Sequence, residues 1–113
     1  MPYLHVKIGK ALDESQAEAL RRGLERIVPI LPNKTVDNCM IHIEQDCAMF
    51  MRGERNPCAF VDVRLFRPSP EDKKAEFGAA LASLLESVCG IPPEFFYMNL
   101  LEMDHWYTGG CGK

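Results

Sequence analysis

The chain has 113 residues and a hydrophobic fraction of 47%, which fits a single packed domain spanning residues 1–113 and argues against disorder. Its formal net charge of −3 argues against a nucleic-acid partner, because nucleic-acid-binding proteins usually carry a basic face. No stretch resembles a membrane span, and the first residues lack the basic and apolar regions of a secretory signal. A cytoplasmic protein without a membrane partner is expected, and non-classical secretion stays open as an alternative.

The first half of the chain predicts a strand, a helix and a second strand. Residues 2–8 alternate between apolar and polar side chains, which is typical of a strand. Asp13 and Gln16 form a capping-box pattern ahead of an apolar stripe at helical spacing. Pro29 is expected to disrupt the last turn of that helix, and a second strand is predicted over about 38–45.

A long connection and a third strand come next. Residues 46–57 form the connection, in which a short strand is predicted at residues 48–51. The third strand is predicted over about 58–66, with alternate apolar residues sharing one face.

The second helix has clear start and stop signals. Ser69 is predicted to cap it, with Pro70 at its first position and acidic residues in its first turn. Gly90 fits a left-handed cap at its C-terminus. A last strand is predicted over about 95–102, and the glycine-rich tail is expected to be loose or to pair at a sheet edge.

Strand–helix–strand therefore occurs twice, over about 2–45 and 58–103. A helix between two strands makes them parallel neighbours with a right-handed crossover. Each helix has one apolar stripe, so both can cover one face of a four-stranded mixed sheet, which gives an α+β fold. The other sheet face also carries large apolar residues, and oligomerisation is the simplest way to cover them.

Cysteine and histidine offer little chemistry in this sequence. The five cysteines are odd in number, widely spaced and without a C-x-x-C pair, which predicts free thiols in a reducing compartment. The three histidines, His5, His42 and His105, are scattered and show no zinc-ligand spacing, so no metal site is predicted.

Pro2 is the first candidate for catalysis. If Met1 is removed, Pro2 presents a secondary amine, and apolar surroundings would lower the pKa of that amine. A general base works best when its pKa lies near the working pH. The alternative is that Pro2 is an ordinary second residue, and Met-Pro alone favours that reading.

Several polar residues could assist a base. Tyr97 and Asn99 share one face of the last strand and could hold or polarise a carbonyl. Lys34 could attract a substrate carboxylate, and the pair Arg64 and Arg67 could clamp one. For each of them an ordinary structural or solvated role stays open.

Taken together, these residues resemble the macrophage migration inhibitory factor and D-dopachrome tautomerase family, within the tautomerase superfamily. The markers are collinear and nearly free of gaps. They are Met1-Pro2, Lys34, Pro57-Cys58-Ala59, Tyr97-Met98-Asn99, and the segment from Glu102 to Trp106 followed by Gly109.

The resemblance implies a homotrimer whose sheets line a central barrel, with three sites at the subunit interfaces. It implies an isomerase that interconverts keto and enol forms of a phenylpyruvate-like 2-keto acid or an aryl enol. By position, Pro2 would be the general base, and Lys34 would bind the substrate carboxylate with the backbone N–H of Phe66. Tyr97 and Asn99 would reach in from the neighbouring subunit, and no metal or organic cofactor is implied.

The sequence also departs from the family pattern. The C-x-x-C of cytokine members is incomplete at Cys58, which argues against a thiol-redox role, and the short tail puts trimer pairing through it in question. The usual small, glycine-rich segment after the third strand is replaced by Phe66-Arg67-Pro68-Ser69-Pro70, which adds a cation. The alternatives are a superfamily decarboxylase or dehalogenase that uses protonated Pro2 and Arg67, or a non-enzymatic cytokine-like binding protein.

Overall fold

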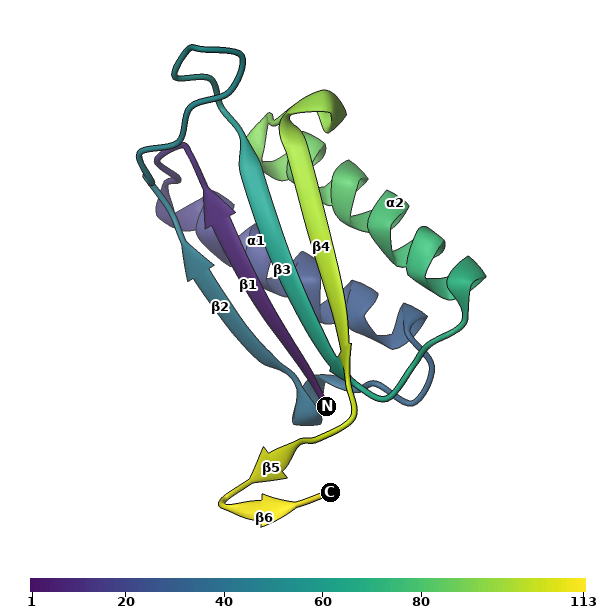
Figure 1. Cartoon of the computed structure of the whole chain (residues 1–113). Helices are drawn as coiled ribbons and strands as arrows, with labels where there is room; N and C mark the ends of the chain where they lie inside the picture. The colour runs from purple at the N-terminus through teal and green to yellow at the C-terminus, as the bar shows by residue number, and fades with distance from the viewer.

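The fold is a four-stranded mixed sheet with two helices on one face (Figure 1). It is taken from a computed structural model that describes all 113 residues. The sheet order is β2-β1-β3-β4, in which β1 pairs with β2 and β3 with β4 in parallel, while β1 and β3 are antiparallel. The strands are β1 (Pro2–Ile8), β2 (Met40–Glu44), β3 (Ala59–Phe66) and β4 (Phe96–Met103). The predicted class and the two parallel crossovers are confirmed.

Local signals explain most of the helix ends. Helix α1 (Glu14–Ile27) begins with the predicted capping box between Asp13 and Gln16. Pro29 lies in the short 3-10 turn η1 (Val28–Ile30), so the α-helix ends where disruption was predicted. A second 3-10 turn, η2 (Val36–Asn38), leads into β2.

Helix α2 (Glu71–Cys89) ends at Gly90, whose left-handed φ of 69° confirms the predicted C-terminal cap. Its start corrects the prediction at Ser69. The N-cap is Pro70, and the Ser69 hydroxyl is buried without a hydrogen-bond partner. The Ser69 N–H instead donates to the Glu102 carboxylate over 2.6 Å, so a contact with the end of β4 overrides the local capping preference. The 3-10 turn η3 (Pro93–Phe95) precedes β4.

The connection before β3 also differs from its prediction. No strand forms at residues 48–51; a single bridge joins Met51 to Glu54 across Arg52 and Gly53, both at positive φ. The other strand bounds agree with the predictions to within two residues.

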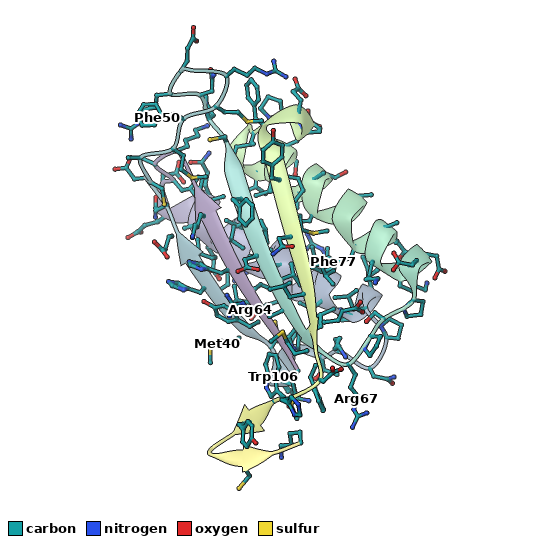
Figure 2. All side chains as sticks on the ribbon, in the orientation of Figure 1. Met40, Phe50, Arg64, Arg67, Phe77 and Trp106 are labelled. Carbon is teal, nitrogen blue, oxygen red and sulfur yellow. The ribbon has the colours of Figure 1, made fainter.

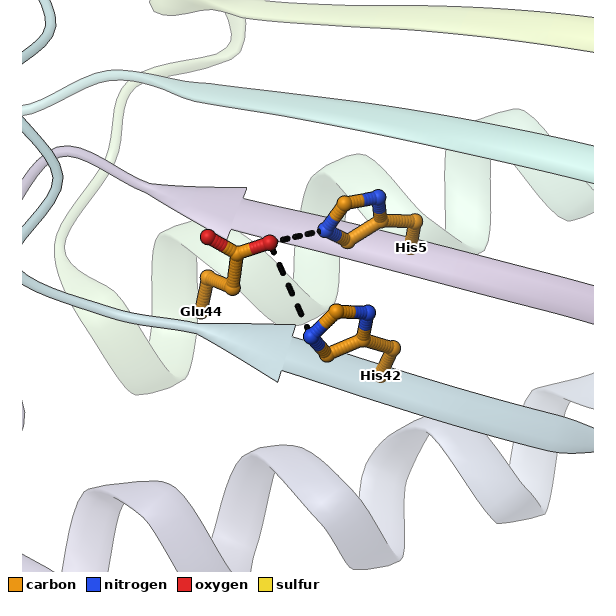
Figure 3. A group of neighbouring side chains, drawn as sticks. All are labelled: His5, His42 and Glu44. Atoms are coloured by element: carbon orange, nitrogen blue, oxygen red, sulfur yellow. Dashed lines mark hydrogen bonds and ion pairs between the residues drawn. The ribbon is translucent and has the colours of Figure 1, made fainter.

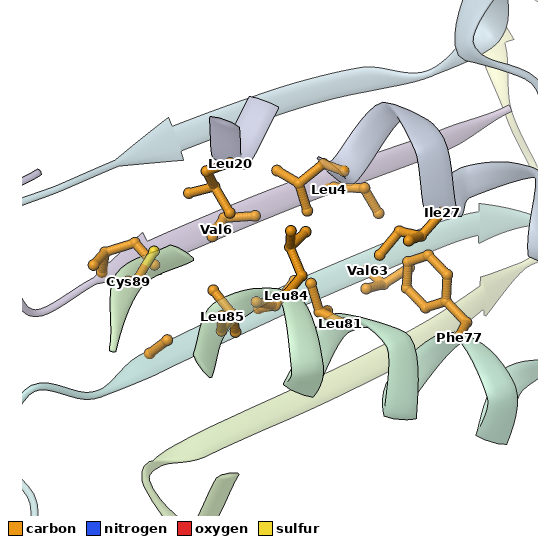
Figure 4. Close-up of a cluster of buried hydrophobic side chains, with 14 of the residues drawn as sticks. Leu4, Val6, Leu20, Ile27, Val63, Phe77, Leu81, Leu84, Leu85 and Cys89 are labelled. Atoms are coloured by element: carbon orange, nitrogen blue, oxygen red, sulfur yellow. The ribbon is translucent and has the colours of Figure 1, made fainter. Parts of the chain in front are cut away.

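The core lies between the sheet and the two helices (Figure 4). The inward positions of β1 and β3 alternate as predicted and are fully buried or nearly so. Helix α1 packs against α2 at Gly23, where a Cβ would stand 2.2 Å from Cδ1 of Leu84 on α2. The partly buried packing partners include residues of β2 and β4, so one core serves all four strands.

The opposite face of the sheet has no helix over it. Large exposed apolar side chains lie on it, at Met40, Tyr97, Leu101 and Met103, which confirms that this face carries apolar residues. Beyond β4 the tail forms a small hairpin of β5 (Tyr107–Thr108) and β6 (Cys111–Gly112), which extends past the end of the sheet (Figure 1). None of the helices is long and apolar enough to cross a membrane.

Candidate functional site

The site is built around the start of the central strand β1. Pro2 is its first residue, is buried, and lies opposite Leu65 near the end of β3. The Phe66 N–H donates a hydrogen bond to the Met1 carbonyl over 3.3 Å. The bond between Met1 and Pro2 therefore lies at the sheet end where β1 begins and β3 finishes.

Lys34 reaches the same place from the turn after η1. Its backbone N–H donates to the Leu31 carbonyl over 3.1 Å, and its side chain is largely buried. The Lys34 Nζ donates to the Phe66 carbonyl over 3.1 Å. Both main-chain polar groups of Phe66 are thus engaged here, one by the Met1 carbonyl and the other by an ammonium group.

This environment perturbs the amine at the start of the chain. Burial is the first cause that lowers the pKa of the Met1 amine, and the positive charge of Lys34 is the second. Burial also raises the pKa of the nearby Cys39 thiol to about 11. Both shifts favour neutral forms, as expected where water is partly excluded.

A surface depression of about 760 Å³ opens over this end of the sheet. Its volume is in the range of small-molecule sites. It is lined by the start of β1, the η2 segment, β3 and the C-terminal tail. The lining residues include Met1, Pro2, Tyr3, Asn38, Cys39, Met40, Arg64, Met103, His105, Trp106, Tyr107 and Lys113.

The two candidate arginines occupy different places. Arg64 lines the depression and forms an ion pair with Asp62 over 3.3 Å. Arg67 follows β3 with a left-handed φ of 74°, and its guanidinium lies 4.7 Å from the centre of the Phe66 ring. Arg67 is not among the lining residues, and in the view of Figure 2 it lies to the right of the end of β4, whereas Arg64 and Met40 lie to the left.

Tyr97 and Asn99 are not brought to Pro2 within one chain. Both are exposed on the open face of β4, as the alternation predicted. Pro2 pairs with Leu65, and Leu65 pairs with Glu102, so Glu102 marks the level of Pro2 on β4. At about 3.3 Å per residue, Tyr97 lies about 16 Å and Asn99 about 10 Å from Glu102 along the strand. A site containing all of these residues requires more than one copy of the chain.

The tail contributes more of this depression than the sequence reasoning predicted. Trp106 packs near the Phe66 ring, with 6.5 Å between ring centroids, and Tyr107 also lines the depression. The available signal was Gly109-Gly110, a two-residue glycine turn between short segments, which is typical of a hairpin. Both glycines have positive φ, as that turn requires.

The histidines require a correction. His5 and His42 are register partners on the parallel strands β1 and β2, and their rings stack 4.2 Å apart. Glu44 of β2 completes a compact group with them (Figure 3). Two of the three histidines are therefore not scattered, because parallel pairing brings together positions that are far apart in the sequence.

Comparisons with known proteins give a consistent picture of the fold. No protein-family model and no curated protein matches the chain. Among solved structures, Leishmania major MIF2 is 22% identical, with a TM-score of 0.90 over 100% of this chain and 97% of that one. The macrophage migration inhibitory factor-like protein of Entamoeba histolytica is 17% identical, with a TM-score of 0.85 over 99% of this chain and 98% of that one.

A fused 4-OT protein, described as an asymmetric trimer, is 15% identical, with a TM-score of 0.83 over 97% of this chain and 94% of that one. At these identities the likeness establishes the fold alone. The chain has the fold of these macrophage migration inhibitory factor and 4-OT structures, which confirms the fold that the sequence resemblance implied.

Proposed function

We propose that this chain is a tautomerase that interconverts keto and enol forms of a phenylpyruvate-like 2-keto acid or an aryl enol, with Pro2 as general base after removal of Met1. The observation that carries the proposal is the setting of Pro2. It is buried at the edge of a small-molecule-sized depression, beside the Phe66 N–H and the Lys34 ammonium. The fold shared with tautomerase-superfamily structures supports the same reading.

Loss of Met1 would prepare the site in two ways. It turns the Pro2 amide into a secondary amine with a free electron pair. It also removes the carbonyl that now accepts the Phe66 N–H, so this donor becomes free for an anion. Burial and Lys34 already lower the pKa of the amine one residue earlier, and the same two causes would favour a neutral Pro2 amine.

In the reaction, the neutral Pro2 nitrogen takes a proton from the carbon next to the keto group. The electron pair of that C–H bond forms the carbon–carbon double bond of the enol, and the carbonyl oxygen then receives the proton from the prolinium. The reverse sequence gives the keto form. Lys34 keeps two N–H donors beyond its bond to the Phe66 carbonyl, so it can hold the substrate carboxylate together with the Phe66 N–H.

We also propose that the working form is a homotrimer. The open sheet face carries exposed large apolar side chains, and Tyr97 and Asn99 lie too far along β4 to meet Pro2 of their own chain. Association that covers this face could bring Tyr97 and Asn99 of one copy to Pro2 of another. Light scattering should give three chains per particle, and a monomer at assay concentration would contradict the shared site.

The decisive test combines intact-protein mass spectrometry with a phenylpyruvate tautomerase assay. Protein without Met1 should turn over phenylpyruvate, and Pro2→Ala should lower kcat/KM by roughly 10-fold or more because the positioned ring amine is lost. Activity of Pro2→Ala equal to that of the parent would refute the role of Pro2.

The pH dependence separates the enzyme alternatives. A base must be neutral, so tautomerase activity should fall as the pH drops through the pKa of the Pro2 amine. A decarboxylase or dehalogenase that uses protonated Pro2 should instead lose activity as the pH rises. Arg64 and Lys113 line the depression, and Arg67 does not, so Arg64 would replace Arg67 as the arginine of that alternative. A parent protein with a free Pro2 amine and no turnover of any such substrate would favour the non-enzymatic binding protein.

A further inference from the structure

On the open face of the sheet, well along the strands from Pro2, three potential metal ligands converge. His5 of β1 and His42 of β2 lie directly opposite each other, and their rings are stacked with an interplanar angle of only 3°. Their Nε2 atoms both approach the same oxygen, Oε1 of Glu44, at 2.5 and 3.6 Å (Figure 3). The three ligand atoms lie within 4.8 Å of one another.

We propose that His5, His42 and Glu44 form a binding site for a divalent transition-metal ion such as Zn²⁺. Two imidazole nitrogens and a carboxylate are a ligand set that suits zinc, copper, nickel and iron. Ligands at 2.0–2.2 Å around a tetrahedral zinc stand about 3.3 Å apart, so side-chain movements of about 1 Å would be enough to close the site. The remaining coordination positions would point away from the sheet, into the space that the proposed homotrimer would enclose.

The Tyr3 hydroxyl can favour the metal-binding form of His42. The Tyr3 hydroxyl lies 3.1 Å from Nδ1 of His42, and if Nδ1–H donates to that oxygen, the lone pair of Nε2 is available for a metal.

Two charged neighbours act in opposite directions. Asp62 of β3 is the register partner of His5 on the other side, and its Oδ1 is buried with no hydrogen-bond partner. Its Oδ2 is paired with Arg64 at 3.3 Å, so only part of the Asp62 charge adds negative potential beside the site. Lys7, the register partner of Glu44, carries a positive charge that would repel a bound cation.

The test is calorimetric titration of zinc chloride into the full chain after treatment with a chelator. The parent should bind one Zn²⁺ per chain, and His5→Gln and His42→Gln should each weaken binding by about 10-fold or more. His105→Gln is the matched control, because this histidine is outside the group, and it should bind like the parent. Lys7→Gln should bind more tightly, since it removes the opposing charge.

Substitution with Co²⁺ identifies the ligand atoms. The expected spectrum has only weak visible bands, as histidine and carboxylate ligation gives, while an intense near-ultraviolet band would indicate thiolate ligation. Any of three results would overturn the proposal. The parent could bind no zinc, both cluster variants could bind zinc as tightly as the parent, or the cobalt spectrum could show a thiolate band. Of the substituted residues, His5, His42 and Lys7 lie on the open face of the sheet and His105 lies in the segment after β4. Circular dichroism with thermal melting checks that each variant is folded.

Discussion

Retention of Met1 should abolish the proposed tautomerase activity, and the structure allows the size of the effect to be estimated. The Met1 acyl group removes the basic electron pair of Pro2, and general base catalysis typically contributes about 10²- to 10⁴-fold. The Met1 carbonyl also occupies the Phe66 N–H, and a lost hydrogen bond to a charged group costs about 1.5–3 kcal/mol, or roughly 10- to 150-fold. The two losses together predict a kcat/KM for phenylpyruvate at least about 10³-fold lower.

The assay uses one preparation as its own control. Protein expressed so that Met1 is retained is treated in vitro with methionine aminopeptidase, and samples are taken over time. Intact-mass spectra give the fraction that has lost Met1, and the same samples are assayed with phenylpyruvate. Activity should rise in proportion to that fraction from a baseline near zero. Full activity in the Met1-retaining sample would refute two proposed roles. These are the role of the Pro2 amine as general base and the role of the Phe66 N–H in binding the substrate carboxylate.

Three further predictions concern the rest of the fold. In urea unfolding experiments, Gly23→Ala should lower the unfolding free energy by about 1–2 kcal/mol, because its Cβ would overlap Leu84 of α2. Gly78→Ala is the control and should be neutral or stabilising, because its Cβ would meet only the flexible end of Met98 at 3.2 Å. The pKa of Glu102 is lowered by its lysine partner and then by a backbone N–H, so its contribution to stability is present above its ordinary pKa of 4.5 and is lost as the pH falls through the lower folded value. Glu102→Gln should therefore flatten the fall of unfolding free energy with decreasing pH in that range, and an unchanged slope would contradict the assignment. The thiol of Cys39, with its pKa raised to about 11, should resist alkylation at pH 8, whereas exposed Cys111 should be modified first, as peptide mass mapping would show.

The elements of this fold could be predicted because their signals are local. The alternation of residues 2–8, the Asp13 capping box and the Gly90 cap each depend on a few neighbouring residues, and all three are present. Ser69 shows the limit of such reasoning. Its position is set by Glu102, thirty-three residues away, and no local pattern contains that contact.

The site could be predicted only in part, for the same physical reason. Pro2 and Lys34 were candidates from their own chemistry, and the resemblance added their roles and Phe66. The structure brings all three together at one end of the sheet. The histidine group was missed, because its two rings meet through the register of β1 and β2 rather than through sequence spacing. A rule based on ligand spacing detects sites on one helix or loop, and it fails where ligands come from two strands.

Phe66 acts at this site through its main chain alone, giving its carbonyl to Lys34 and its N–H to Met1. Every amino acid except proline carries the same two groups, so selection for this chemistry leaves the identity of the side chain free. The aromatic ring can then evolve separately, to shape the wall that it shares with Trp106. Under the proposed mechanism, this position would serve catalysis without placing any demand on its own side chain.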